Sequence, residues 1–506
     1  VQQGDPLGPF LFCLAQQPIL KAVREQFPNA LLTAYMDDID CCAPKDVANA
    51  ILTKIEKDFP ALGLRLNAPK SASDLLLRQD ISITPNLKIL GAFLTAPPDT
   101  LFQDTIKATN LATEVPDKQS ALFLLRYAIT SVPVFELHMY PPEQTQTMAS
   151  QVNLQAKQAF EKYLNQPISH SSWEQAQLPQ GVGLGLHSIE LTCAPAYTAS
   201  WAAAIPVLLK SFPILSDFLS NPAFLASPQG QFSTSALQYL SNAQHVAPDL
   251  ITGDFSQQKL QHSLSAVEHR KEWPYTSESG TPVQCAIKLC SRNEEAAHWL
   301  KAIPSEPSLS IPSSLFTTAL KLLLSVEFIP PGMKCICGEE VDPQGHHLLH
   351  CKHKGGQFSR HDSIVTTLTA LGYSINAATL HELTGLFADY KRMDCVFWNK
   401  GTNGHPLAID VSVASPIAKP IRNECAHKPL CAANQHLSHK NSKYHNACSA
   451  IHMDFKPFIL ETFGAIHPSA IKDVLEPLLE NAPKEGPKAF IRPNWAACTA
   501  RAYWLQ

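Results

Sequence analysis

Two adjacent acids near the N-terminus, Asp37 and Asp38, are the first residues whose type and spacing indicate chemistry. Apolar runs flank them at residues 30–34 and 39–42, which predicts a β-hairpin with both carboxylates at its tip. Like charges this close would be costly to bury unless a cation bound them. Enzymes that transfer phosphoryl groups use such pairs to hold Mg²⁺ ions roughly 3.5–4 Å apart. The pair therefore predicts a magnesium site, and a solvated acidic turn is the alternative.

A second group combines three cysteines with two histidines. Cys335 and Cys337 are one residue apart, and His346, His347 and Cys351 follow them. Thiolate and imidazole are ligands that tetrahedral Zn²⁺ prefers, and a closed set of four is typical of a structural site, not of a catalytic one. The sequence therefore predicts one zinc ion held by the three cysteines and one histidine, and it leaves the choice between the two histidines open.

Two further acids, Asp394 and Asp410, each lie within an apolar segment, and a Gly-rich stretch at residues 400–404 separates the segments. This pattern predicts two strands joined as a hairpin. Carboxylates on neighbouring strands could share one Mg²⁺, and a nearby lysine would stabilise charge at a cleaved phosphate. A following helical segment offers Lys440 and Lys443 as candidates. Each acid taken singly is more often a surface charge, so the prediction rests on the ordered set.

Length and composition limit the elements that must position these groups. A chain of 506 residues suits about three domains, and 45% hydrophobic with 17% charged residues is an ordinary folded composition. With 40 basic and 44 acidic residues, any basic nucleic-acid-binding surface must be local. The 14 cysteines are scattered, unlike those of a small secreted fold.

No signal peptide opens the chain, and the most apolar stretch, residues 194–209, falls short of the ~20 residues of a bilayer span. We therefore expect an intracellular protein with no membrane partner. The chain begins with Val1 and not with Met, so we also expect that a natural start is missing.

Hydrophobic periodicity gives a coarse order of elements. Residues 47–62 have helical spacing of apolar positions up to Pro60. From about residue 100 to 330 the pattern is mostly helical with proline-rich breaks, and a helix at about 359–371 precedes alternating strands and helices. The second half therefore predicts an α/β region after a helical one.

The N-terminal motifs resemble the second half of the reverse-transcriptase palm of non-LTR retrotransposons. Four segments carry the resemblance in order and spacing: residues 3–9, 35–38, 63–70 and 88–91. It implies that Asp37 binds metal with Asp38 in support. It also implies contacts to template, nucleotide, pyrophosphate or primer by Gln3, Gly4, Pro6, Gly8, Pro9, Lys70 and Gly91. The family needs a further metal-binding aspartate on a strand that would precede Val1, so we expect an incomplete polymerase site.

The later motifs resemble the zinc knuckle and restriction-like endonuclease of such elements. The ordered set is Arg360-His361, the Asp394 strand, the Asp410 strand, Lys443-Tyr444 and, as a lesser candidate, Glu461. The resemblance implies a PD-(D/E)xK core, with Arg360, His361 and Tyr444 near substrate. Two departures stand out: Arg392-Met393 replaces the proline usual before the first acid, and Ser412 occupies a common lysine position. The family commonly supplies that lysine from the downstream helix, so the resemblance implies Lys443, with Lys440 as the reserve.

Together these interpretations predict a multidomain α+β and α/β chain. It would comprise part of a reverse-transcriptase palm (1–95), a helical thumb and connecting region (96–330), a CCHC zinc knuckle (331–355), a PD-(D/E)xK-like nuclease (356–485) and a C-terminal tail (486–506).

The resemblance implies a fragment of an RNA-directed DNA polymerase and endonuclease that acts in target-primed reverse transcription. Its cofactors would be Mg²⁺ or Mn²⁺ and Zn²⁺, its partners an RNA template, target DNA and deoxynucleotides, and its compartment the nucleus. A catalytically inactive nucleic-acid-binding remnant of a decayed element is the alternative. The complete set of Asp394, Asp410 and Lys443 favours the enzyme.

Overall fold

The computed structural model describes residues 6–74, 77–84, 86–89, 92–94, 97–179, 183–212, 214–247, 256–272, 280–305, 309–351, 356–385 and 392–480. The chain divides into two compact units, Val1–Leu101 and Phe102–Gln506. The C-terminal tail expected from residue 486 lies outside the described residues.

The first unit is built from a helix, a hairpin and a second helix. Val23 of the first helix packs with Ile51 and Ile55 of the second, and this contact forms its small core. The predicted hairpin is confirmed, because its strands pair antiparallel from Leu31–Cys42 to Tyr35–Asp38. The elements are α1 (Gly8–Gln26), β1 (Leu31–Tyr35), β2 (Asp38–Cys42), α2 (Lys45–Asp58) and the short strands β3 (Ala72–Ser73), β4 (Ser82–Ile83), β5 (Lys88–Ile89) and β6 (Ala92–Phe93).

The second unit is helical up to residue 323, as the sequence predicts. In chain order its helices are α3 (Gln103–Ala112), α4 (Lys118–Phe123) continuing as a π-helix over Leu124–Ile129, α5 (Val134–Met139), α6 (Pro142–Leu164), α7 (His170–Gln177), α8 (Ile189–Ser211), α9 (Ile214–Leu219), α10 (Pro222–Leu225), α11 (Pro228–Val246), α12 (Gln257–Glu272), α13 (Pro282–Ser291), α14 (His298–Lys301) and α15 (Ser313–Leu323).

Two stretches of this region are long and apolar enough to cross a membrane by length and composition, Lys118–Met139 and Ile189–Ser211. The expectation that the most apolar stretch is too short is therefore wrong, because α8 extends that stretch at its N-terminal end. A core helix passes the same test. α8 packs against α5, α6, α11 and α12, so its apolar composition also serves helix packing.

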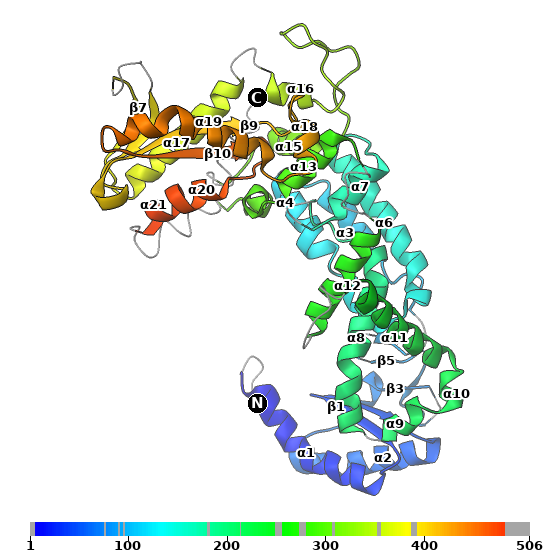
Figure 1. Cartoon of the computed structure of the whole chain (residues 1–506). Coiled ribbons are helices and arrows are strands. Elements are labelled where there is room, and N and C mark those ends of the chain that lie inside the picture. The colour runs from blue at the N-terminus through cyan, green and yellow to red at the C-terminus, as the bar shows by residue number, and fades with distance from the viewer. Residues whose placement is uncertain are drawn as a thin grey trace. The chain divides into compact units, whose positions relative to one another are not determined.

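The C-terminal half of the second unit contains a four-stranded mixed sheet of order β10-β9-β8-β7. β7, β8 and β9 are antiparallel neighbours, and β10 runs parallel to β9. Figure 1 shows α17 and α19 lying against this sheet. The elements are α16 (His346–His350), α17 (Gly356–Ser374), β7 (Thr379–Leu383), β8 (Met393–Phe397), β9 (Leu407–Ala414), α18 (Arg422–Cys425), α19 (Cys431–Ser449), β10 (Asp454–Glu461), α20 (Pro468–Ala470) and α21 (Glu476–Glu480).

The central strands β8 and β9 are covered on both faces. Cys395 of β8 contacts Thr369 of α17, whereas its neighbour Val396 packs in a cluster with Tyr444 of α19. Successive side chains of a strand point to opposite faces, so the two helices cover opposite sides of the sheet. Burial on both faces explains why these strands are nearly continuous apolar runs with acids inserted in them.

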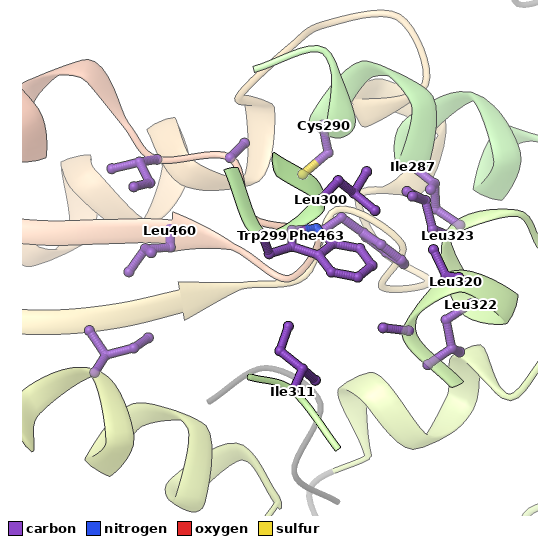
Figure 2. Close-up of a cluster of buried hydrophobic side chains, with 14 of the residues drawn as sticks. Ile287, Cys290, Trp299, Leu300, Ile311, Leu320, Leu322, Leu323, Leu460 and Phe463 are labelled. Carbon is purple, nitrogen blue, oxygen red and sulfur yellow. The ribbon is translucent and has the colours of Figure 1, made fainter. Parts of the chain in front are cut away.

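The helical region and the sheet share one hydrophobic core. The same buried cluster includes Trp299 of α14, Leu320 of α15 and Leu460 of β10. Figure 2 shows these side chains around Phe463, which follows β10. Asn293 also exchanges hydrogen bonds of 3.4 Å with the backbone of Ile466. The end of the helical region therefore buries one end of the sheet and forms one body with it.

Candidate functional site

The Cys/His cluster comes together as a four-ligand site. The ligand atoms of Cys335, Cys337, His347 and Cys351 all lie within 4.8 Å of one another. The sulfurs of Cys335 and Cys351 are 3.7 Å apart, and Cys337 Sγ lies 3.2 Å from His347 Nε2. Two thiolates on one tetrahedral zinc, each ~2.3 Å from the ion, would be roughly 3.8 Å apart. The donor set and its spacing fit Zn²⁺.

The structure decides between the two histidines. His347 joins the thiolates, and its other ring nitrogen, Nδ1, lies 3.5 Å from Glu339. A carboxylate in that place fixes the orientation of a ligating imidazole. His346 points elsewhere: its Nε2 lies 3.4 Å from the carbonyl oxygen of Leu322, and its ring meets the ring of Phe463. Burial lowers the pKa of His346, as expected for a neutral ring in the core.

Local backbone chemistry explains how this short segment brings the four candidate ligands together. Gly338 and Gly345 have positive φ angles of 88° and 75°, a conformation that glycine adopts without strain. Asp342 then accepts hydrogen bonds from the backbone N–H groups of His346 and His347, at 2.9 and 2.6 Å. This carboxylate caps α16 and fixes the rotation of the helix that carries His347.

The second candidate site is the pair of acids in the sheet. β8 and β9 pair with Cys395 opposite Ile409, so one further step along the ladder places Asp394 opposite Asp410. Directly opposed side chains have Cβ atoms about 4.5–5.5 Å apart. Both acids are buried, each with 4% of its surface exposed. The predicted strand pair is therefore present, and its register brings the two carboxyl groups close enough for the charge of Asp394 to act on Asp410.

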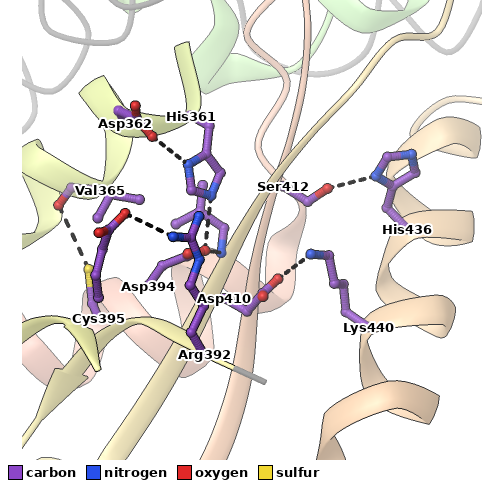
Figure 3. Close-up of polar contacts among 12 residues, drawn as sticks. His361, Asp362, Val365, Arg392, Asp394, Cys395, Asp410, Ser412, His436 and Lys440 are labelled. Carbon is purple, nitrogen blue, oxygen red and sulfur yellow. Dashed lines mark hydrogen bonds and ion pairs between the residues drawn. The ribbon is translucent and has the colours of Figure 1, made fainter. Parts of the chain in front are cut away.

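Each buried acid has a cation beside it, as Figure 3 shows. Asp394 Oδ2 accepts hydrogen bonds from His361 Nε2 at 3.0 Å and from the N–H of Val411 at 2.7 Å. Asp410 forms an ion pair with Lys440. The two cations offset the charge that two buried carboxylates would otherwise place in the sheet.

The two carboxyl groups differ in acidity. Burial acts to raise the pKa of Asp394, but the hydrogen bond and charge of His361 outweigh it and lower that pKa below its usual value. Burial raises the pKa of Asp410 despite the opposing effect of Lys440. In return, the hydrogen bond with Asp394 raises the pKa of His361 to about 8. Asp394 is thus the more firmly ionised of the pair.

The lysine beside the acids is Lys440 and not Lys443. Lys443 Nζ instead lies 4.6 Å from the centre of the Tyr444 ring. Of the two lysines expected, the reserve choice Lys440 is thus the one paired with an acid, and the catalytic role of either stays a prediction. The reason for the pairing is helical geometry. Residues four apart share a helix face, so Lys440 lies on the side of buried Tyr444, whereas Lys443 is rotated about 100° away from it. Tyr444 is an apolar position suited to burial, and a lysine four residues before it would have been the one expected to lie beside the acids.

Two residues that sequence reasoning missed join this site. His436 Nδ1 lies 2.7 Å from Ser412 Oγ. Ser412 is two positions after Asp410 on β9, and His436 is four positions before Lys440 on α19. The periods of strand and helix therefore align these residues in two neighbouring rungs. Tyr444 completes the row, because its hydroxyl interacts with Asp410 and its pKa is raised to about 12 by burial and by that carboxylate.

Two other expected residues have structural contacts. Arg360 is buried and donates a hydrogen bond from Nη2 to the carbonyl oxygen of Leu349 at 2.5 Å, which ties α17 to α16. Glu461 is 1% exposed and accepts a hydrogen bond of 3.1 Å from the N–H of Ala433 in the first turn of α19. A carboxylate there interacts favourably with the helix dipole. Glu461 therefore fixes the start of α19.

In the first unit, the paired acids lie at the tip of the hairpin. The turn is formed by Met36, with φ +55°, and Asp37, and Asp38 opens β2. Both acids are exposed, so the cost of burying them does not arise in this unit. Gln16, which the sequence did not single out, donates a hydrogen bond of 2.5 Å to the carbonyl oxygen of Met36 and holds the turn against α1.

Only some of the other residues expected near polymerase substrates lie within the part of the chain that the structure describes. Pro6 precedes α1, whose first residues are Gly8 and Pro9. Lys70 is exposed at the end of a short 3₁₀ turn, Ala68–Lys70. The expectations for Gln3, Gly4 and Gly91 lie outside the described residues.

Comparison with known proteins gives one distant relationship. The chain is 26% identical over 196 residues to the 132 kDa protein of the retrotransposable element SLACS from Trypanosoma brucei gambiense. The match covers 36% of this chain and 16% of that protein. No protein-family model matches the chain. The chain is therefore related, by a distant and partial similarity, to a protein of a non-LTR retrotransposon.

Proposed function

We propose that the region from about residue 331 to 480 is a metal-dependent DNA endonuclease of a non-LTR retrotransposon protein. The observation that carries the proposal is the ion pair of Lys440 with Asp410, opposite Asp394. Two opposed acids on central strands and a lysine from the following helix fit the PD-(D/E)xK core expected from the sequence. The related SLACS protein supports the retrotransposon assignment.

The chemistry of the donor atoms fits a hard cation such as Mg²⁺, which prefers carboxylate oxygens. Asp394 and Asp410 would hold the ion. Among the described residues, both hydrogen bonds of Asp394 go to Oδ2, so Oδ1 is available as a ligand. A bound Mg²⁺ would supply a Lewis acid that polarises the scissile phosphate and lowers the pKa of an attacking water.

The protein's own side chains would then orient the reacting groups and neutralise the charge that develops on the phosphate. Lys440 is placed to hold a phosphate oxygen or the attacking water, because its ammonium already lies at the carboxylate of Asp410. An ammonium in a site shielded from water stabilises the added charge of the transition state more strongly than it would in bulk solvent. The hydrogen bond from His361 restricts the orientation of Asp394, and the ion pair with Lys440 does the same for Asp410.

The test is a nicking assay on supercoiled plasmid with the full chain and added Mg²⁺. We expect Asp394→Asn and Asp410→Asn to lower the cleavage rate by at least about 100-fold. DNA binding should remain, since it draws on separate basic contacts to phosphates. Asp473→Asn is the matched control, because Asp473 is a partly exposed acid paired with Lys456. Equal cleavage by all variants would place the active site elsewhere, and binding without cleavage by the wild type would favour the inactive remnant.

For the first unit, we propose that the hairpin of Asp37 and Asp38 is part of a polymerase metal site. The support is the hairpin itself, with two acids at a tip that α1 holds in place. In this proposal the hairpin supplies two of the carboxylates, and a further aspartate must complete the site.

A further inference from the structure

Side chains on one face of α19 contact side chains of β9 at successive positions along the helix and the strand. His436, Lys440 and Tyr444 recur every four residues along the helix and therefore share a face. That face meets Asp410 and Ser412, which share a face of the strand. Lys440 and Tyr444 both interact with Asp410. The remaining rung, Ser412 with His436, belongs to the same row but has no role in the chemistry described so far.

The Ser412–His436 hydrogen bond determines where the imidazole carries its proton. Ser412 is 9% exposed, and a buried hydroxyl must donate its proton to an acceptor. Among the described residues its partner is His436 Nδ1, at 2.7 Å. Nδ1 therefore acts as the acceptor, and the proton of a neutral ring resides on Nε2. Partial burial of the ring and the nearby charge of Lys440 both lower the pKa of His436, which favours the neutral ring.

The Nε2–H group is oriented but has no hydrogen-bond partner within the described part of the chain. His436 is exposed as a residue, and it lies on the side of the helix that carries Lys440, four positions along the chain. In Figure 3 the imidazole and the ammonium of Lys440 both project from α19 toward β9. A fixed N–H donor one helical turn from that ammonium is a suitable contact for a phosphate oxygen.

We infer that His436 binds a phosphate oxygen of the DNA strand through Nε2–H, and that Ser412 is the positioning residue that orients its ring. This inference rests on the proposed nuclease function and adds a substrate contact to it. The composition of α19 is consistent with the approach of a polyanion. None of its residues, Cys431–Ser449, is acidic, and the exposed positions carry amide, hydroxyl, imidazole and ammonium groups.

Two substitutions of His436 test the roles of its two ring nitrogens separately. Asparagine places its amide near the position of Nδ1, so His436→Asn keeps a partner for Ser412 and removes the outer donor. Glutamine reaches the position of Nε2, so His436→Gln keeps an outer N–H donor. His445→Asn is the matched control, because His445 lies half a turn around the helix from His436.

The experiment measures single-turnover nicking of plasmid by the full chain in Mg²⁺. We expect His436→Asn to slow cleavage by about 10- to 100-fold, the usual effect of losing one hydrogen bond to a charged group. His436→Gln should stay within about fivefold of the wild type. Ser412→Ala should slow cleavage by about three- to tenfold, and Ser412→Thr should restore most of that loss. Equal rates for His436→Asn and the wild type, or equal losses for Asn and Gln, would overturn the inference.

A measurement of DNA affinity tests the His436 contact independently of whether the protein cleaves DNA. Affinity for a short DNA duplex is measured by fluorescence anisotropy with Ca²⁺ in place of Mg²⁺. We expect His436→Asn to weaken binding by about three- to tenfold, while His436→Gln and His445→Asn bind as the wild type does. If the wild type binds but does not cleave, the nuclease proposal fails and this comparison still decides the contact. Unchanged affinity in His436→Asn would then overturn it.

Discussion

Replacing the two adjacent histidines of the zinc cluster one at a time should produce two different defects. His347 lies with the three cysteines, so His347→Ala removes a zinc ligand. His346 is buried against Phe463 and outside the cluster, so His346→Ala removes part of the core and leaves the ligand set intact. Although the residues are neighbours in sequence, we expect zinc loss from the first variant and lower stability with full zinc from the second.

The magnitudes follow from the contacts of each ring. A structural zinc site binds its ion with about 10–16 kcal/mol, so one of four ligands accounts for roughly 3–4 kcal/mol, or about 100- to 1,000-fold in zinc affinity. The side chain of His346 is 9% exposed, and removing a buried side chain of this kind costs about 1–3 kcal/mol of unfolding free energy. Zinc affinity of the His346 variant should stay within about threefold of the wild type.

The assay is zinc content by elemental analysis, with affinity from competition against a chromophoric chelator, on the full chain. Thermal unfolding at saturating zinc gives the stability of each variant. Zinc at one ion per chain in His347→Ala together with loss of zinc in His346→Ala would refute the assignment of the ligand. Equal loss in both variants would show that the orientation of α16 depends on both rings.

Three further results follow from the same structure. Lys440→Ala should slow plasmid nicking by about 100-fold while Lys443→Ala changes it by less than about threefold, and the reverse order in the same assay would restore the lysine expected from sequence. The pKa of His361 is raised to about 8 by its bond with Asp394, so its stabilising effect is full below about pH 6.5 and is lost as pH rises through 8. His361→Asn should therefore flatten the pH dependence of the metal-free protein's unfolding free energy in this window, by at most about 2 kcal/mol, and a curve parallel to the wild type would contradict the ion pair. This chain alone should not extend a primer on an RNA template with Mg²⁺ or Mn²⁺, because Asp37 and Asp38 supply only part of a metal site, and measurable nucleotide incorporation would contradict that reading.

The sequence by itself determined the elements that depend on local pattern. The hairpin at Asp37 and Asp38 is confirmed because apolar runs on both sides of a short polar turn have few other ways to pair. The strands of Asp394 and Asp410, and the helix that follows them, are present for the same reason. Three cysteines and two histidines in sequence order also sufficed to predict one cluster that could hold a metal ion.

Tertiary structure decided which histidine faces the cysteines and which lysine lies beside the acids. Neighbouring helix residues point about 100° apart, so either His346 or His347 could have faced the thiolates until α16 docked against Phe463. Lys443 likewise points about 100° away from Tyr444. Lys440 lies one turn before Tyr444, and the packing of Tyr444 against the sheet brings Lys440 to Asp410. These choices depend on long-range contacts, which periodicity in a single segment does not encode.

Burial and shared packing were likewise decided only in three dimensions. Arg360 and Glu461 carry charged side chains of the kind found in nuclease sites. Each of them instead forms a hydrogen bond to the backbone that ties a helix to its neighbour. The helical region and the sheet read as separate domains in sequence, but Trp299 and Leu460 belong to one core. The reason is physical: sequence pattern reports the surface that a segment must bury, whereas the partner that buries it is found only when distant segments meet.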